Sequence, residues 1–277
     1  MSTVTISAAD VNKLRTQTGA GMMDCKKALT EANGDFEQAI DYLRKKGQKV
    51  AANRADKEAK EGYILAKTNA DASKGYLVAL SCETDFVAKS ADFVKFADDL
   101  VNVAVSSNAS SIDDLKSQKM GDLTVADKLF DIIGKIGEKI DITSYEVIDA
   151  PKVVIYIHPG NKVVSMVGMS SGSASSDIAK DVAMQIAAMN PVAIDKDDVD
   201  VRTLEREIEI GKEQARAEGK PEEMLEKIAQ GKLNKFYKEN TLLNQQFIKD
   251  DKVDIRTYLD KTEKGLTVKV FRRIQIG

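Results

Sequence analysis

The segment GYLVALSCETDFVAKSADFVKFADDL, residues 75–100, predicts a strand followed by a helix. Its first seven residues are uncharged and mostly apolar, and from Ala91 onward apolar residues recur at helical spacing. The connection between the two elements, CETDFVAKS (residues 82–90), places Phe86 between an acid and a valine. Because connections usually run over the protein surface, an aromatic residue at this position requires an explanation.

A hairpin–helix–strand pattern around this segment occurs twice along the chain. A strand at residues 63–69 and a turn that begins near Asp71 precede the segment, so the first unit opens with a β-hairpin. Aligning YLVAL with KVVSM places a second unit about 86 residues further on. We therefore predict an α+β fold with a duplicated core. The second unit consists of VVIYIH (153–158), KVVSMVGM (162–169), DIAKDVAMQIAAM (177–189) and LTVKVFRRIQI (266–276).

Residues 1–47 predict a bundle of three helices. Ser7, with an acid three residues later, is typical of a capping box, and Gly19 is placed to end the first helix. Asp35 is placed to cap the third helix, and Gly47 to end it. Three helices in so short a segment form a small bundle that we expect to fold by itself.

The rest of the chain divides by composition. A charged, alanine-rich segment after the bundle predicts a solvated helical linker. Within the second unit, two charged helices joined at Lys220 and Pro221 predict an antiparallel helical hairpin of coiled-coil type, either a solvated structural arm or a partner-contacting one. The predicted parts are 1–47 (bundle), 48–61 (linker), 62–149 (first core subdomain) and 150–277 (second core subdomain, with 202–236 as the inserted hairpin).

Composition excludes several classes of protein. The 277 residues include 43% apolar and 31% charged residues, as expected of a soluble globular chain. A net charge of −3 argues against nucleic acid as the main partner, since phosphate binding needs a strong basic footprint. No apolar run reaches transmembrane length, and the start MSTVTISAADVNK lacks a signal-peptide core. We expect a cytoplasmic protein with no membrane partner.

Catalytic and metal-binding motifs are not found in the sequence. The one histidine, His158, and the two distant cysteines, Cys25 and Cys82, cannot form a histidine- or cysteine-rich metal site, and we expect both cysteines to be buried. The chain contains neither GxxxxGK[ST] nor GxGxxG, so a phosphate-binding loop is lacking. We expect a binding protein and not an enzyme, with no cofactor, no metal and no nucleotide site of its own.

The second unit serves as an internal comparison for Phe86. It has VGMSSGSASSD (167–177) where the first unit has SCETDFVAKSAD (81–92), so the fold does not require an aromatic residue in this connection. Ser90 resembles a helix start, which leaves Phe86 outside the helix and exposed to a partner. The alternative is that Phe86 begins the buried face that continues with Phe93. Both interpretations stay open at this stage.

A second unusual feature is the adjacent pair Met22 and Met23. Neighbouring residues on a helix point about 100° apart, and Cys25 and Leu29 already occupy the inner face of the second helix. The two methionines therefore cannot easily both be buried. An exposed pair of flexible, polarizable methionines is typical of a contact surface. The alternative is that one methionine lies in the core and that the other has no particular role.

Two long motifs resemble the signatures of one family. LRTQTGAGMMDCKKAL (14–29), with NGDFEQAIDYLRKKG (33–47) after it, resembles the first signature of bacterial elongation factor Ts, and SCETDFVAK (81–89) resembles the second. The similarity extends over almost the whole chain and includes KIGEKIDI (135–142) and YIHPGNKVV (156–164). The second signature usually starts with an acid, and here Ala79 stands in that place, so the difference affects the strand before the loop.

The resemblance implies a guanine-nucleotide exchange factor for the translational GTPase elongation factor Tu. In that family a ubiquitin-associated-like three-helix bundle docks on the GTPase, and a TDF loop enters beside its Mg²⁺ and phosphate site. The second core subdomain holds another domain of the partner. The positions that match are Leu14, Met22 and Met23 for docking, Thr84, Asp85, Phe86 and Val87 for the intruding loop, and Ile136, Gly137 and His158 for core support.

One rival function and one question of assembly remain. A ubiquitin-associated-type adaptor without exchange activity could use the same three-helix bundle, although it would not need the TDF loop or the repeated core. The sequence also leaves open whether the chain acts alone, as a dimer, or in a 2:2 assembly with the GTPase.

Overall fold

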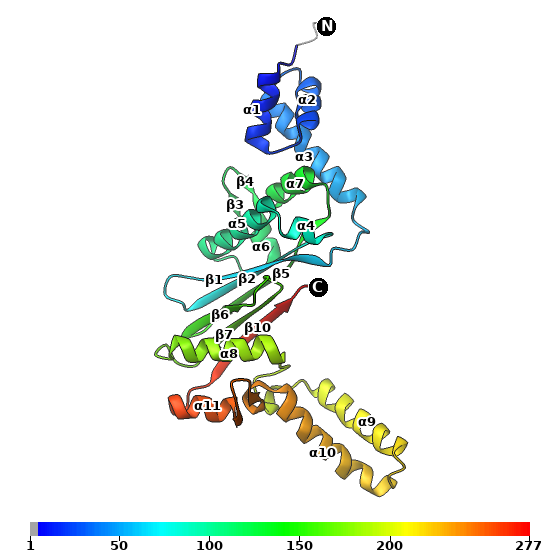
Figure 1. Cartoon of the computed structure of the whole chain (residues 1–277), viewed down its shortest axis with the longest axis vertical. Helices are drawn as coiled ribbons and strands as arrows, with labels where there is room; N and C mark the ends of the chain where they lie inside the picture. Colours follow the sequence, from blue (N-terminus) through cyan, green and yellow to red (C-terminus); the bar gives the residue numbers. More distant parts are fainter. Residues whose placement is uncertain (1–4) are drawn as a thin grey trace.

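The computed structural model describes residues 5–277, so residues 1–4 of the predicted bundle segment lie outside the described residues. The elements follow one long axis (Figure 1), with a helical bundle at the N-terminal end, two sheets in the middle and a helical hairpin at the other end. Helices and strands are both extensive, which confirms the predicted α+β class.

Two three-stranded antiparallel sheets share one topology. The first has the order β1-β2-β5 and the second the order β10-β7-β6, so the second strand of each hairpin is central. This shared order confirms the predicted duplication. The strands are β1 (Glu61–Thr68), β2 (Lys74–Cys82), β5 (Ile140–Asp149), β6 (Lys152–Ile157), β7 (Val163–Met169) and β10 (Val268–Gln275).

The two sheets pack face to face, and helices cover their outer faces (Figure 1). Aliphatic side chains from both sheets, among them Leu77 and Met166, are fully buried between them. Burial of one such side chain contributes about 1.5–3 kcal/mol, so this layer joins the two units into one body. Helices α5 (Ala91–Ser107) and α7 (Val125–Ile136) cover the first sheet, and α8 (Ser176–Met189) covers the second.

A turn of the second unit protects the outer edge of the first sheet. The carbonyl of Asn161, between β6 and β7, accepts a hydrogen bond from the backbone N–H of Ile64 at 2.8 Å. The side-chain amide of Asn161 donates to the Ile64 carbonyl at 3.1 Å. Its φ of 55° lies in the left-handed region, which asparagine adopts more readily than most residues. The backbone N–H and carbonyl of Ile64 on edge strand β1 are therefore unavailable for pairing with another strand.

Three helices form the bundle at the N-terminal end, as the sequence predicted. The Ser7 side chain accepts a hydrogen bond from the backbone N–H of Asp10, and the Asp10 carboxylate accepts one from the Ser7 N–H, which confirms the capping box. Gly19, with a φ of 69°, ends the first helix. The helices are α1 (Ala8–Thr18), α2 (Met22–Glu31) and α3 (Phe36–Asn53).

The predicted end of the third helix at Gly47 is wrong, because α3 continues to Asn53. Gly47 lies against α7, where a β-carbon on it would stand 2.1 Å from the carbonyl oxygen of Phe130. A β-carbon on Gly134 of α7 would likewise stand 3.1 Å from the Cα of Gly47. The two glycines therefore permit a close crossing of α3 and α7, and Gly47 does not terminate its helix.

The predicted solvated linker is also wrong in part. Val50 and Ala51 lie on the last turns of α3 and pack against the hydrophobic core beneath α5 and α7. Residues 54–60 form turns and irregular backbone before β1 begins. The division of the chain after residues 47, 61 and 149 stays a prediction.

The inserted helical hairpin is confirmed as two paired helices, α9 (Val201–Ala217) and α10 (Glu222–Asn240), which project from the second unit (Figure 1). They approach closely at Gly211, where a β-carbon would lie 3.2 Å from the Cα of Ala229. Within the described part of the chain, no helix combines the length and the apolar character needed to cross a membrane. The elements that the sequence did not predict are short: α4 (Asp85–Ala88), α6 (Ile112–Ser117), β3 (Lys119–Met120), β4 (Leu123–Thr124), η1 (Lys196–Asp198), η2 (Leu242–Asn244), β8 (Gln246–Phe247), β9 (Asp250–Asp254) and α11 (Ile255–Thr262).

Gly47→Ala should lower the melting temperature, because the added methyl group would overlap the Phe130 carbonyl and force α3 away from α7. Overpacking of this kind costs about 1–3 kcal/mol. Gly231→Ala on α10 is the control, since a β-carbon there meets no atom within 4 Å. The control should gain about 0.5–1 kcal/mol from the greater helix propensity of alanine. Thermal unfolding followed by circular dichroism measures both, and equal melting temperatures would contradict the close crossing.

Candidate functional site

Phe86 is the most exposed of the large hydrophobic side chains in the described residues, with 83% of its surface accessible. It lies on the one-turn helix α4, between the end of β2 and the start of α5. Ser90 is the N-cap of α5, and Phe93 on that helix is fully buried. The alternative that Phe86 begins the buried face of α5 is therefore wrong, and its exposure is confirmed.

The residues around Phe86 are held in place even though its ring is free. Thr84 caps α4, and its hydroxyl accepts a hydrogen bond from the Val87 N–H at 3.4 Å. Val87 packs against the hydrophobic core, and its carbonyl accepts a hydrogen bond from the Ser90 hydroxyl at 2.8 Å. Ala88 is buried. The turn therefore presents one aromatic ring to solvent from a packed base.

The chain between α7 and β5 supports this turn directly. Gly137, with a φ of 83°, ends α7, and Ile136 before it packs against the core. The next residue, Glu138, accepts hydrogen bonds from the backbone N–H groups of Glu83 and Thr84, both at 3.1 Å. It also accepts one from the Thr84 hydroxyl at 2.7 Å. The structure thus brings the predicted support pair, Ile136 and Gly137, next to the predicted loop.

Glu83 forms a second set of contacts at the base of the turn. Its carboxylate accepts hydrogen bonds from the Arg54 guanidinium at 2.8 Å and from the backbone N–H of Lys139 at 2.6 Å. Burial raises the pKa of Glu83, but the Lys139 N–H and the Arg54 charge outweigh it and hold the pKa below its ordinary value. The Lys139 ammonium in turn donates to the carbonyls of Ala55 and Lys57 at 2.6 and 2.9 Å.

Asp85 faces a hollow shared by the two core units. Its carboxylate pairs with Lys89 at 2.7 Å, and the hydrogen bond from Lys89 is the main cause of its lowered pKa. A cavity of about 480 Å³ lies beside these two residues and extends to Glu61, Gly160 and Lys162. Gly160 and Lys162 belong to the β6–β7 turn, so the hollow places this turn of the second unit beside the Phe86 loop.

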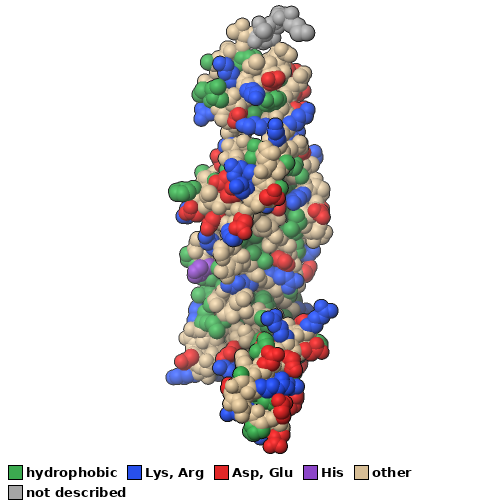
Figure 2. Space-filling view, turned by 90° about the vertical axis from the view of Figure 1, so that its right-hand side faces the viewer, with side chains coloured by type: hydrophobic (Ala, Val, Ile, Leu, Met, Phe, Trp, Pro, Cys, Tyr) green, Lys and Arg blue, Asp and Glu red, His purple; other side chains and the backbone are tan. Residues whose placement is uncertain are grey.

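His158 lies at the start of the same β6–β7 turn and is exposed. The Tyr156 hydroxyl stands 3.0 Å from Nδ1 of His158. The backbone N–H of His158 donates a hydrogen bond to the Val163 carbonyl at 2.9 Å. The chain's one histidine is visible in purple at the surface in Figure 2. His158 therefore belongs to the same turn as Gly160 and Lys162, which line the hollow beside Asp85.

The methionine pair lies elsewhere, on α2 in the N-terminal bundle (Figure 1). Met22 is 54% exposed and Met23 74% exposed, while Cys25 and Leu29 are fully buried. The prediction that both methionines cannot be buried is confirmed, and the alternative with one of them in the core is wrong. Leu14 differs from its predicted role in docking, because it is fully buried in the bundle core and cannot reach a partner.

Both cysteines are buried, as predicted, and neither is in a disulfide. Burial and, to a smaller extent, the negative charge of Glu138 raise the pKa of the Cys82 thiol to about 12. A thiol with so high a pKa stays protonated at neutral pH and is a poor nucleophile. Cys82 instead donates through Sγ to the Thr84 carbonyl at 3.2 Å, as part of the packed base of the turn.

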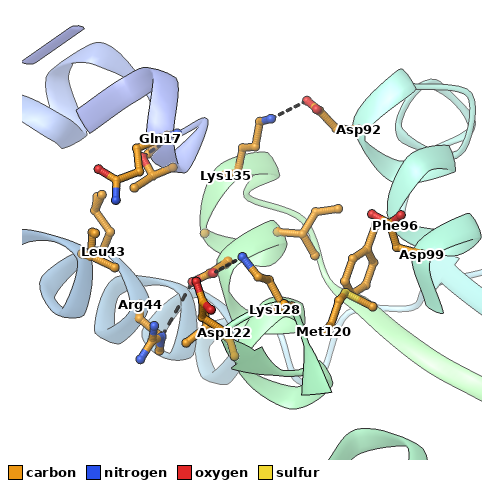
Figure 3. A pocket seen from close by; sticks show the side chains of 18 of the residues that line it. Gln17, Leu43, Arg44, Asp92, Phe96, Asp99, Met120, Asp122, Lys128 and Lys135 are labelled. Carbon is orange, nitrogen blue, oxygen red and sulfur yellow. Dashed lines mark hydrogen bonds and ion pairs between the residues drawn. The ribbon is translucent and has the colours of Figure 1, made fainter. Parts of the chain in front are cut away.

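A larger cleft of about 850 Å³ separates the bundle from the first core unit (Figure 3). Lys135 pairs with Asp92 across it at 2.8 Å, and Arg44 and Lys128 approach Asp131 at 3.8 and 3.7 Å. Burial raises the pKa of Asp131, and the nearby Lys128 and Arg44 offset part of that rise. Both signs of charge line the cleft, so it concentrates neither anions nor cations. Among residues 5–277, no group of three His, Cys, Asp or Glu side chains is arranged to hold a metal ion.

The polar residues that hold the Phe86 turn were not predicted from the sequence. Glu83 lies inside the quoted motif, but the sequence does not show that its partner is Arg54. Glu138 directly follows the predicted Ile136–Gly137 pair, and its position after a helix-ending glycine was the only local indication. These contacts join positions far apart in the chain, and neither periodicity nor spacing marks such pairs.

Comparison with known proteins gives consistent matches. A family model described as Elongation factor TS matches residues 83–277. The elongation factor Ts of Cytophaga hutchinsonii is 57% identical over 276 residues, which cover 99% of each chain. The corresponding proteins of Amoebophilus asiaticus and Christiangramia forsetii are 52% and 50% identical over 275 and 273 residues, each covering 98% of this chain and 99% of the relative.

The burial of these residues predicts opposite effects of substitution within the bundle. Met22→Ala combined with Met23→Ala should change the free energy of unfolding by less than about 0.5 kcal/mol, as is usual for surface substitutions. Leu14→Ala should lower it by about 2–5 kcal/mol, because it leaves a cavity in the bundle core. Denaturant unfolding measures both variants. A large loss of stability in the double methionine variant would show that the pair belongs to the core.

Proposed function

The chain belongs to the elongation factor Ts family of translation elongation factors, and from this premise we propose that it binds elongation factor Tu·GDP and promotes GDP release. One observation carries the proposal: an exposed Phe86 on a turn whose base is packed and hydrogen-bonded. An apolar ring held rigidly in solvent is suited to insertion into a partner, since its burial there contributes about 1.5–3 kcal/mol. No catalytic group of the chain itself is required.

Exchange of this kind depends on coupling between two binding equilibria. A protein that binds best to the nucleotide-free GTPase lowers the affinity for GDP, and GDP lowers the affinity for that protein by the same factor. Contacts far from the nucleotide provide binding energy, and part of it offsets the strain at the nucleotide site. Mg²⁺ neutralises phosphate charge, so disturbing its ligands weakens nucleotide binding directly.

We assign the intruding role to the loop of Thr84, Asp85, Phe86 and Val87. Phe86 acts as a wedge in an apolar pocket of the GTPase beside the Mg²⁺ and phosphate site. Asp85 competes for polar groups that order the magnesium ion, after its pair with Lys89 opens. Thr84 and Val87 hold the turn. Support for this assignment comes from the exposure of Phe86 and from the packing of Val87.

The remaining contacts are assigned to two other surfaces. Met22 and Met23 dock the N-terminal bundle, a ubiquitin-associated-like module, on the GTPase domain, and their exposure supports this role. His158, with Ile136 and Gly137 behind the loop, forms the core contact with the partner. The net charge of −3 supports a protein partner in the bacterial cytoplasm in preference to nucleic acid.

The assay that tests the proposal follows release of a fluorescent GDP from elongation factor Tu with and without the chain. We expect release to accelerate with increasing concentration of the chain and to saturate. No acceleration at micromolar concentration would overturn the exchange function. If the chain still bound the GTPase in that case, the rival function of a ubiquitin-associated-type adaptor would be favoured.

Phe86→Ala should slow catalysed GDP release by about one to two orders of magnitude, because each 1.4 kcal/mol of lost wedge energy is about tenfold. The melting temperature should stay near that of the parent, since the ring is 83% exposed. Phe93→Ala is the matched control: it removes a fully buried ring and should lower the melting temperature strongly. Asp85→Ala should slow release less and alter its dependence on Mg²⁺.

Replacing both Met22 and Met23 by alanine should weaken association with the GTPase by about 1–3 kcal/mol, as expected for truncated interface anchors. Met224→Ala is the matched control, since Met224 is also an exposed methionine but lies on α10 at 45% exposure. Calorimetric titration of the nucleotide-free GTPase measures all variants. If Met224→Ala lost as much affinity for the GTPase as the Met22 and Met23 double variant, the docking assignment would be wrong.

A further inference from the structure

Two carboxylates outside the predicted contact residues join the base of the Phe86 turn to the segment that follows α7. Glu138 accepts three hydrogen bonds, from the N–H groups of Glu83 and Thr84 and from the Thr84 hydroxyl, at 3.1, 3.1 and 2.7 Å. Glu83 accepts from Arg54 at 2.8 Å and from the Lys139 N–H at 2.6 Å. We call Glu83 and Glu138 the carboxylate clamp.

The Glu83 half of the clamp is partly sheltered from solvent. The Glu83 side chain is only 16% exposed, so water screens its pair with Arg54 less than it would a surface ion pair. Hydrogen bonds with an ionised partner are shorter and about twice as strong as neutral ones. All three hydrogen bonds to Glu138 come from two consecutive residues, Glu83 and Thr84. Phe86 lies two positions after Thr84.

The clamp connects the Phe86 turn to the ends of two helices that pack closely together. Arg54 is the C-cap of α3, the helix that leaves the N-terminal bundle, and Glu138 follows α7 after Gly137. The two helices cross closely at Gly47 and Gly134. The turn that carries Phe86 is therefore fixed relative to the bundle through both helices, and not only through its own strand.

We propose that Glu138, acting with the Arg54–Glu83 pair, is a positioning residue for nucleotide exchange. The proposal rests on the proposed function and deepens it. Binding of the bundle to the GTPase then sets the position of the Phe86 ring, so that the ring reaches the nucleotide site without a further ordering cost. Preorganisation of this kind favours the step that depends on the oriented group.

The physical consequence is a separation between affinity and rate. A loosened turn leaves Met22 and Met23 free to dock, so the affinity of the chain for the GTPase should hardly change. The maximal rate of GDP release depends on the orientation of Phe86, so it should fall. A residue that only stabilised the fold would lower the apparent affinity in proportion to the unfolded fraction and would leave the maximal rate unchanged, because a saturating concentration of the chain still fills the GTPase.

The first experiment measures GDP release over a range of concentrations of the chain. Glu138→Ala should lower the maximal rate by about tenfold, the loss expected when two backbone donors lose their acceptor. The half-saturating concentration should change by less than about twofold, because Met22 and Met23 still dock. Glu138→Gln keeps one amide oxygen as an acceptor, so its maximal rate should lie between those of the parent and the alanine variant. A change in half-saturating concentration with an unchanged maximal rate would overturn the proposal.

A matched control uses another half-buried glutamate of the same unit. Glu146 on β5 pairs with Arg272 at 2.8 Å, away from the turn. Glu146→Gln removes a comparable charge and should leave both the maximal rate and the half-saturating concentration unchanged. An equal loss of rate in this variant would assign the effect to net charge and would overturn the positioning role.

A double variant tests whether Glu138 acts through Phe86. In a chain that already carries Phe86→Ala, Glu138→Ala should slow GDP release no further, because residues that act through one another are not additive. A full additional tenfold loss would show that Glu138 contributes by another route, and the proposal would be wrong.

The last experiment does not depend on exchange activity. The chain contains no tryptophan, so Phe86→Trp introduces a single indole at the turn. Adding Glu138→Ala should increase the nanosecond motion of that indole in time-resolved fluorescence anisotropy. Unchanged motion would overturn the clamp. Should the parent chain fail to accelerate GDP release, the proposed function would be lost, while the anisotropy would still decide whether Glu138 holds the turn.

Discussion

The close crossing of α3 and α7 is the contact on which the arrangement of the molecule depends. Because Gly47 and Gly134 lack side chains, the two helix backbones approach within the space that a β-carbon would fill. The crossing joins the N-terminal bundle to the first core unit. Arg54 at the end of α3 and Glu138 after α7 both form hydrogen bonds with the base of the Phe86 turn. One packing contact thus orients the bundle and the loop relative to each other.

Much of the fold could be predicted because its patterns are local. Strand alternation, helical spacing and capping residues such as Ser7 and Ser90 depend on neighbours in the sequence, so the duplicated units and their helices were found. The helix end predicted at Gly47 is wrong for the same reason. A glycine after a helical pattern locally resembles a helix end, and only contact with Phe130 on a distant helix shows that it is an interior packing residue. The short elements lacked enough residues for a period to be recognised.

The candidate site divides in a similar way between what the sequence could and could not indicate. Phe86 and the Met22–Met23 pair were found because they break local rules, placing apolar residues where a core has no use for them. Leu14 was predicted to be a docking residue because it belongs to the same motif as Met22 and Met23. A motif contains buried supporting residues as well as contacting ones, and the burial of Leu14 places it among the supporting residues. Glu138 follows no such rule, since an acid after a helix is ordinary and its importance lies in the donors it meets.

Comparison of the two core units shows which features the fold itself requires. Both units close a hairpin onto a helix and a third strand, yet the second makes its connection with an open serine-rich loop, in which the Ser171 and Ser173 hydroxyls lie 2.6 Å apart. That loop has no counterpart of α4, and α8 begins without it. The one-turn helix and its carboxylates are therefore additions to a fold that is complete without them. An exposed aromatic ring gains nothing from folding, since it stays in water, and holding it rigid costs conformational entropy. The proposed contact with a partner therefore accounts for Phe86 better than packing does.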